Sequence, residues 1–481
     1  MTDLDRRSFL RGAAAAAGVG LMGGPFQGFF ASAATAAPAR RGRPLGYGPL
    51  RPVGDLRDGV ERLLLPDGFS YRSFDVTGGS LTDGTRIPGR HDGMAAFRGR
   101  NGRSILVRNH EVNGPVGAFG DAGDAYDPAT GGGTTTVEVD RFGDVVRSGV
   151  SLNGTMMNCS GGPMPWRSWI TCEETVNGPD VGPDFTGTPN TSLTQKHGYI
   201  YEVPATGQAP GTPVRNAGRF PHEAAAYDAH SKALYLTEDN FAFPSGFYRY
   251  LPPENPLQTK QLSDGGRLQM LAVSGRPNAD LAGESGPAPA VGSTFDVEWV
   301  DIDDPDPDVT GFTNDQALVA VSGQGLARGA AIFSRLEGAA ADRNTIYFCS
   351  TQGGTPPADA PEPSGFGHGR GQIWAYHTPT NKLHLLYESP SRQVLDLPDN
   401  ITTSRTGTLV LCEDGDEGNY LRGLTTDGRI FDFAKNNIAG RVDDEFAGAT
   451  FSPDHHTLFV NIQASAGMTF AIFGRWGGGG F

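Results

Sequence analysis

The chain has 481 residues, of which 37% are hydrophobic and 9% aromatic, so it can bury a large core and wholesale disorder is not expected. Glycine (69 residues) and proline (35 residues) favour many short strands joined by turns over long helices. The net charge of −15 argues against nucleic acid or an anionic membrane as a partner, whereas clustered carboxylates would suit hard cations such as calcium.

The first segment is typical of an export signal. The pair Arg6–Arg7 precedes an Ala/Gly-rich apolar run, and residues 31–33 (ASA) supply a small-residue cleavage site. The pattern predicts a cleaved twin-arginine signal over residues 1–33 and export by the twin-arginine machinery to the periplasm or the cell exterior. A disordered Ala-rich tail is the alternative interpretation. No later segment offers the roughly 18 apolar residues of a spanning helix, so we expect no stable membrane anchor.

After the signal, residues 34–60 are rich in proline and glycine and predict an extended arm, and residues 61–481 predict one further domain. Within that domain, six segments share one plan: a short polar or small stretch, a Gly/Asp/Ser turn, and an apolar strand that often ends in acids or amides. These segments are residues 91–111, 158–174, 222–240, 336–352, 399–415 and 445–463. Several are followed by a further strand, such as GYIYEV or GRIFDF.

Short antiparallel strands repeated in this way predict an all-β, six-bladed β-propeller. The uneven spacing of the repeats, together with the Pro-, Gly- and Asp-rich stretch 252–310, predicts inserted surface loops. We expect one end of the chain to supply the strand that closes the ring.

The innermost strand of each blade lines the channel of a propeller, so the opening residues of the repeats should converge near the axis. These residues are Asp92, Cys159, Glu223, Glu337, Asn400 and the region of Glu445. The outgoing strands end in Glu111, Glu173–Glu174, Glu238–Asp239 and Glu413–Asp414, which we expect at one face of the disc. Any one of these acids could be a solvated turn residue. As a set, they would repel one another across a narrow channel unless cations neutralised them.

The four cysteines fall into two classes. Cys172, Cys349 and Cys412 end apolar strands, where each is expected to pack as a small apolar residue, and a disulfide between two of them stays possible. Cys159, in the stretch NCSGG, has small polar neighbours and occupies the slot that carboxylates hold in other repeats. One thiolate among carboxylates suits iron or zinc, whereas oxygen ligands in number suit calcium.

Arg335 stands two residues before Glu337 and would point to the same side if the segment is a strand. Its planar guanidinium suits a phosphate oxyanion, although a salt bridge to channel carboxylates is the alternative. His110 and His222 adjoin acids and are expected to be hydrogen-bonding neighbours of a metal site rather than ligands. We find no nucleophile elbow, phosphate-binding loop or His-Glu-x-x-His motif.

An ordered set of motifs carries a resemblance to a known family. The motifs are PGRHDGMAAF, NCSGG with PMPW and RSWITCEE, GRFPHEAAAYD, SRLEG, LPDN, LCEDG and EFAGATFSPD. In these motifs, and from LLLPDGFSY to FSPDHHTLFVNIQ, the chain resembles the PhoX alkaline phosphatases, which are exported by the twin-arginine pathway. The resemblance implies a propeller with two ferric ions (Fe³⁺) and two or three calcium ions (Ca²⁺). It implies hydrolysis of phosphate monoesters and some diesters. We expect the protein to be a monomer.

The resemblance also implies roles for individual residues. Cys159 would bridge the two irons, and Arg335 would hold the substrate phosphate. Glu174, with or without Glu173, and Glu223 and Glu337 would bind the cluster. Asp92, Glu111, Asp399, Glu413 and Asp414 would lie on the calcium side. Two departures are a leucine, Leu336, where many relatives have proline, and a family tryptophan that none of Trp166, Trp169 and Trp374 matches by motif.

Two rival functions share the channel carboxylates. One is a calcium-dependent propeller lactonase or phosphotriesterase, and the other is a non-catalytic exported calcium-binding propeller that binds a glycan or a partner. Neither rival needs Cys159 or Arg335, so metal content and phosphatase activity separate the three.

Overall fold

The computed structural model describes residues 45–358 and 360–481. The signal predicted over residues 1–33 lies outside the described residues. The described part of the predicted arm, residues 45–60, contains strand β1 (Leu50–Val53), which pairs antiparallel with β2 (Leu63–Pro66).

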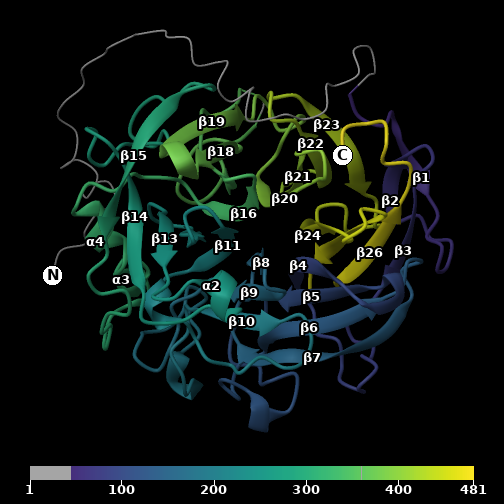
Figure 1. Ribbon diagram of the computed structural model, residues 1–481, viewed down its shortest axis with the longest axis horizontal. Coiled ribbons are helices and arrows are strands. Elements are labelled where there is room, and N and C mark those ends of the chain that lie inside the picture. Colours follow the sequence, from purple (N-terminus) through teal and green to yellow (C-terminus); the bar gives the residue numbers. More distant parts are fainter. Residues whose placement is uncertain (1–44, 359) are drawn as a thin grey trace.

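The strands radiate from a central axis (Figure 1). One four-stranded sheet comprises β4 (His91–Arg98), β5 (Ser104–His110), β6 (Gly132–Val139) and β7 (Val145–Thr155). The next comprises β8 (Gly162–Met164), β9 (Ser168–Cys172) and β10 (Ile200–Pro204). Another combines β20 (Pro398–Thr403), β21 (Leu409–Glu413), β22 (Tyr420–Leu424) and β23 (Ile430–Asn436) with β2 and β1 at its outer edge.

A nine-stranded sheet joins two groups of four strands. The first group is β11 (His222–Asp228), β12 (Ala233–Glu238), β13 (Phe247–Leu251) and β14 (Arg267–Val273). The second is β16 (Leu336–Asp342), β17 (Thr345–Ser350), β18 (Gln372–His377) and β19 (Lys382–Glu388). Strand β15 (Thr294–Asp301) pairs with both β14 and β19. The prediction of surface loops over 252–310 is therefore wrong in part, because the Pro- and Gly-rich flanks obscure two strands.

The ring is closed by the two ends of the described chain. Strand β3 (Ser70–Phe74) pairs with β26 (Met468–Phe473), which completes the sheet of β24 (Glu445–Phe451) and β25 (Thr457–Gln463). This agrees with the expectation that a chain end closes the ring.

Six inner strands, β4, β8, β11, β16, β20 and β24, neighbour one another around the axis (Figure 1). They begin in or next to the six repeated segments. The all-β propeller architecture predicted from the sequence is therefore confirmed, although the described chain forms five hydrogen-bonded sheets because β15 joins two groups.

Neighbouring inner strands approach so closely that small residues are required. A Cβ on Gly93 would lie 1.7 Å from the backbone oxygen of Ser160, and one on Gly162 would lie 1.6 Å from that of Ala225. The glycines beside Cys159 therefore serve backbone packing.

Apolar cores fill the spaces between the sheets, as in the stacked pair Phe247 and Phe348, whose ring centroids lie 4.3 Å apart. Cys172, Cys349 and Cys412 are fully buried in such cores. All four cysteines are free, so the possible disulfide is not formed.

The helices of the described residues are short. They are α2 (Pro256–Thr259), α3 (Asn314–Leu318) and α4 (Ser322–Leu326), with 3-10 turns η2 (Arg100–Gly102), η3 (Ala122–Asp124), η4 (Asn190–Ser192), η5 (Arg215–Ala217) and η6 (Thr378–Thr380). Within the described part of the chain, no helix has the length and apolar character needed to cross a membrane.

Candidate metal centre

A repeated backbone feature precedes four of the inner-strand positions. A non-glycine residue with positive φ stands two residues before each channel residue. The pairs are Arg90 (φ 50°) before Asp92, Met157 (48°) before Cys159, Arg335 (37°) before Glu337, and Leu397 (46°) before Asp399. Non-glycine residues rarely adopt this region, and such strain clusters at functional sites. The repeat therefore imposes the same turn of the chain at the mouth of the channel four times.

Four inner strands carry a β-bulge near their start; three of them follow this turn, and the fourth, β11, does not. In β11, for example, His222 pairs with Glu238 and the next paired residue is Ala225, so Glu223 stands outside the ladder. The same shift leaves Asp92 in β4, Glu337 in β16 and Asp399 in β20 unpaired. A bulge redirects the side chain that it carries. The bulges therefore give these four carboxylates a side-chain direction that differs from the regular alternation along the strand.

The result is a convergence of acids from different strand groups. Ligand atoms of Glu223, Glu337 and Asp399 all lie within 4.8 Å of one another, although the residues come from three inner strands. A second group consists of Glu111, Cys159 and Glu174, within the same limit. The thiol of Cys159 lies 2.9 Å from Oε2 of Glu174. Both groups could hold a metal ion.

The acids influence one another strongly. Burial first, and then neighbouring carboxylates, raise the pKa of Glu111 to about 8 and those of Glu174, Glu223 and Asp399 well above their usual range. Burial raises the pKa of Asp92 to about 6. The pKa of the Cys159 thiol is also raised well above its usual value, by burial and then by Glu174. So many unneutralised acids in one place require either protons or cations.

Two acids that the sequence analysis placed in the repeats but did not assign as ligands, Asp239 and Glu445, join the cluster. Asp239 follows β12 as Glu174 follows β9, and it accepts hydrogen bonds from Arg335 at 3.1 Å (Nε) and 2.6 Å (Nη2). The pKa of Glu445, at the start of β24, is raised well above its usual range by burial and then by Asp399. The sequence signal for both was their place in the repeats.

Arg335 is the cation at the centre of these acids. Its Nη2 lies 3.0 Å from Oε1 of Glu337 as well as contacting Asp239, so the salt bridge considered from the sequence is present. Across the channel, Arg90 occupies the equivalent slot and lies 3.6 Å from Glu111. Among the described residues, no hydrogen bond is formed by Nη1 of Arg335, which leaves donors available to an incoming anion.

Glu173 and Glu413 are not brought into the cluster, which corrects their prediction as ligands. Glu173 accepts hydrogen bonds from the backbone of Met156 (3.0 Å) and Gly198 (2.9 Å), and it pairs with His197 (2.6 Å). Glu413 accepts from the backbone of Asp396 (3.0 Å) and from Arg422 (2.8 Å). Each precedes a channel-facing acid, and successive strand residues point to opposite sides. Asp414, by contrast, is exposed at the end of the same strand pair.

The comparisons with known proteins agree with this site. The family model described as "Alkaline phosphatase PhoX" matches residues 45–147 and 142–466. The chain belongs to the PhoX alkaline phosphatase family. It is therefore an enzyme of the phosphatase class, as the resemblance implied. A search of curated proteins finds no match.

Among solved structures, the chain is similar to PhoX from Pseudomonas fluorescens in complex with vanadate, a transition state analogue. The TM-score is 0.63 at 17% identity, over 91% of this chain and 99% of that chain. This likeness shows the shared fold. A gluconolactonase from Xanthomonas campestris matches at a TM-score of 0.38 and 13% identity (90% and 99% covered). The PQQ domain of a pyranose dehydrogenase from Coprinopsis cinerea matches at 0.39 and 10% (86% and 97%). The last two scores are too low to carry an argument.

Two kinds of residue considered for the PhoX site lie elsewhere. His110 bonds to Gly89 O (2.9 Å) and Thr135 Oγ1 (3.0 Å), and burial lowers its pKa to about 3. Burial likewise lowers the pKa of His222 to about 3, so neither histidine suits acid–base chemistry near neutral pH. The indole of Trp169 donates to Asn109 (2.9 Å), that of Trp374 to Gln372 (3.2 Å) and that of Trp166 to Glu202. None of these indoles contacts the acid cluster.

Below the acids the channel narrows and then widens. Nδ2 of Asn400 donates to Oγ of Ser160 at 2.8 Å, so Asn400 lies near the axis as expected. The acid that meets Glu223 and Glu337 is its neighbour Asp399. Beyond the bond between Asn400 and Ser160, the inner strands line a cavity of about 310 Å³ with residues such as Ala226, Ala340 and Thr450. The acids and this cavity therefore occupy successive levels of the channel.

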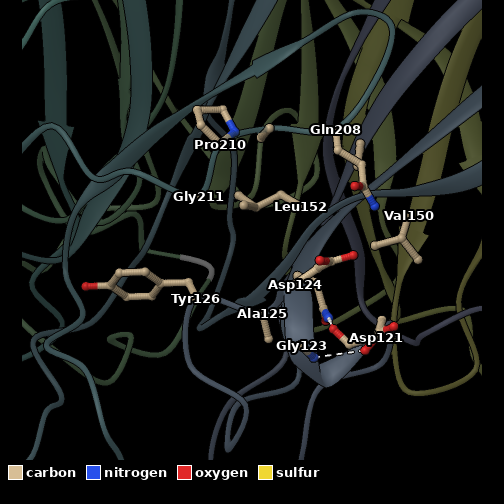
Figure 2. Close-up of a pocket in the computed structure, with 13 residues that line it drawn as sticks. Asp121, Gly123, Asp124, Ala125, Tyr126, Val150, Leu152, Gln208, Pro210 and Gly211 are labelled. Carbon is tan, nitrogen blue, oxygen red and sulfur yellow. Dashed lines mark hydrogen bonds between the residues drawn. The ribbon is translucent and has the colours of Figure 1, made fainter.

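A cavity of about 370 Å³ lies outside the channel, between the loop of η3, the end of β7 and residues 208–211 (Figure 2). Asp121 caps its own loop by accepting from the backbone of Gly123 at 2.9 Å. None of the clustered acids lines this cavity, so it does not contribute to the candidate metal centre.

Proposed function

We propose that this phosphatase hydrolyses phosphate monoesters, and some diesters, at a cluster of two ferric ions and two or three calcium ions in the channel. The main support for this proposal is that one thiol, Cys159, lies among converging carboxylates beside Arg335. The proposed iron-side ligands are Cys159, Glu174, Glu223 and Glu337. The proposed calcium-side ligands are Asp92, Glu111, Asp399 and Asp414, with Asp239 and Glu445 as neighbouring acids.

The residues present fit such a cluster. The thiol of Cys159 with Glu174 combines sulfur and oxygen donors, which suits iron, and oxygen donors in number suit calcium. Each of the two groups also contains a proposed calcium-side acid, Glu111 in the first and Asp399 in the second, as a cluster that holds both kinds of ion requires. Among the described residues, the ion pairs with the clustered acids come from Arg335 and the half-exposed Arg90. Bound cations would supply the remaining positive charge and polarise the oxygens of a phosphate.

The protein itself binds and orients the substrate. Arg335 donates hydrogen bonds to the phosphate oxygens through its free edge, while Asp239 holds the opposite edge of the guanidinium. Donors fixed in advance stabilise the charge that grows on these oxygens as the ester bond breaks. Since the Pseudomonas fluorescens PhoX is described with vanadate, we expect vanadate to inhibit this enzyme as well.

We further propose that the protein is exported through the twin-arginine pathway, by means of residues 1–33, and that it is a monomer that binds neither nucleic acid nor membrane. Replacing Arg6–Arg7 with a lysine pair should retain the protein in the cytoplasm, as measured by fractionation. Light scattering should give the mass of one chain. An export level unchanged by the lysine pair would contradict the pathway.

Elemental analysis and a phosphatase assay on the same purified sample, with and without a calcium chelator, test the main proposal. We expect about two iron atoms per chain and loss of activity on chelation. In Cys159→Ser, iron and activity should fall together. Calcium without iron would favour one of the two rival propellers, and full iron with full turnover in Cys159→Ser would overturn the thiolate assignment.

A further inference from the structure

An exposed aromatic side chain, Phe241, stands directly beside the proposed phosphate-binding arginine. It lies in the loop between β12 and β13, two residues after Asp239. The residue is 54% exposed, and the guanidinium carbon of Arg335 lies over its ring at 5.2 Å from the centroid. Single exposed apolar residues are common and need no explanation. Phe241 differs from such residues because its ring packs against the guanidinium of Arg335.

Phe241 is held in place although its ring is exposed. The backbone of Phe366 donates to the carbonyl oxygen of Phe241 at 2.8 Å. Gly365 has φ +112°, and a Cβ there would lie 2.9 Å from that oxygen and 3.3 Å from the ring atom Cε2. On the other side, the backbone of Asn240 donates to Ser245 Oγ at 3.1 Å. The neighbouring loop therefore fits against Phe241 only because it carries a glycine, and the ring is positioned before any substrate arrives.

The direction in which a substrate must extend follows from the surroundings of Arg335. Asp239 and Glu337 contact Arg335 on the side that faces the channel. Deeper in the channel, the hydrogen bond between Asn400 and Ser160 leaves little room. The alcohol part of a bound phosphate ester must therefore extend toward the mouth, where Phe241 lies. A flat aromatic group there can pack against the exposed ring, as aromatic pairs prefer.

We propose that Phe241 is a specificity-determining residue that favours phosphate esters of aromatic alcohols by packing against their leaving group. This inference rests on the proposed function of the channel as a phosphatase site. It assigns to Phe241 no part in metal binding and no part in holding the phosphate.

The test compares two substrates in Phe241→Ala. We expect kcat/KM for phenyl phosphate to fall by about 3- to 10-fold, mainly through KM, and that for glycerol 1-phosphate to stay within a factor of about two. Comparing variant with wild type for each substrate cancels the difference in leaving-group chemistry. Phe241→Tyr should restore the preference. The matched control is Phe142→Ala, which removes a 61% exposed phenylalanine from the turn between β6 and β7 and should change neither substrate.

A binding measurement separates this inference from the proposed function. Calorimetry on the metal-loaded protein should show weaker binding of phenylphosphonate in Phe241→Ala, with unchanged binding of methylphosphonate. Equal losses for both ligands would mean that Phe241 acts only by placing Arg335, and no loss for either would mean that it contacts neither; both results overturn the inference. A wild-type protein that hydrolyses no ester refutes the phosphatase proposal, while selective loss of phenylphosphonate binding still supports the role of Phe241.

Discussion

Neighbouring acids at the ends of three strands have opposite surroundings. The pairs are Glu173–Glu174, Glu238–Asp239 and Glu413–Asp414. The first member of each pair faces the wall and accepts hydrogen bonds from protein donors. Glu173, for example, accepts from the backbone of Met156 at 3.0 Å and of Gly198 at 2.9 Å. Glu238 accepts from Gly246 and Tyr248 through Oε2 alone, and its Oε1 has no partner among the described residues. The second member lies toward the cluster: Glu174 meets mainly other acids, Asp239 pairs with Arg335, and Asp414 is exposed at the strand end.

This difference offers a way to tell a structural carboxylate from a proposed metal ligand. Both kinds are negatively charged, and they are separated by one position in the chain. A buried carboxylate with several donors is already stabilised by the protein, whereas one that meets mainly carboxylates needs a cation. The supply of donors, and not burial or residue type, separates the two roles.

The largest effect should come from changing the two members of one pair separately. In Glu174→Gln, bound metal should fall and kcat/KM should drop by roughly 10³-fold, because a cluster-facing charge is lost. In Glu173→Gln, the folded protein should keep its metal content and most of its activity. Elemental analysis and phosphatase assays check both. Equal loss of metal in the two variants would break the comparison.

A somewhat smaller effect is expected at Arg335, which pairs with acids and is proposed to hold the substrate phosphate. Arg335→Ala should keep its iron and lose roughly 10²- to 10³-fold in kcat/KM, because the phosphate loses its fixed donors. Arg335→Lys should recover only part of this loss, since lysine lacks the planar fork. Iron lost together with activity in Arg335→Ala would instead assign the arginine to the integrity of the cluster.

The wall-facing acids should matter for stability. Glu173 and Asp127 both contact the buried His197, and the pKa of His197 is raised to about 9, chiefly by Glu173, against the effect of burial. Glu173→Gln should therefore cost about 3 kcal/mol in the free energy of unfolding, because the imidazolium loses its closest partner. Denaturant unfolding of metal-free protein measures this cost. A matched change at an exposed acid, Asp67→Asn, should cost almost nothing.

Much of the arrangement of the inner strands and their acids could be predicted from the sequence. The repeated alternation of polar openings and apolar strands located the inner strands, and the slot of Cys159 and Glu337 followed from it. What the sequence could not resolve was the choice within each acidic pair. That choice depends on the direction of a side chain at a strand end, and a one-residue shift reverses it.

Three further features depend on tertiary structure. The bulges that free Asp92 and Glu223 arise from pairing between strands, and no local pattern marks them. Strand β15 was hidden by its Pro- and Gly-rich flanks, and its pairing with β19, which comes more than 80 residues later in the chain, leaves no local pattern. Glu445 joins the cluster although the bulge of β24 falls later in its strand, between Ala447 and Thr450. The position of Glu445 in the repeat therefore does not by itself predict which residues surround it.

The smallest effect is expected in the pH dependence of the stability of the metal-free protein. This measurement tests directly whether the clustered acids need the positive charge of bound cations. The folded pKa values of Asp92 and Glu111, about 6 and about 8, lie above the ordinary carboxyl value near ~4. The metal-free folded protein therefore holds more protons than the unfolded chain between these limits. The stability that these groups contribute is fully present below about pH 4 and is lost as the pH rises through 6 and 8.

In chelator-treated protein, the melting temperature should consequently fall between pH 5 and 8, by roughly 5 °C relative to metal-loaded protein over the same range. Taking the difference between the two samples cancels the wall-facing Glu238 and Glu413, which titrate in both. Glu111→Gln should reduce the difference near pH 8, because the group with the higher pKa is gone. If the difference in melting temperature between the two samples stays constant with pH, cations do not replace protons in the channel. The distinction between cluster-facing and wall-facing acids would then have no electrostatic basis.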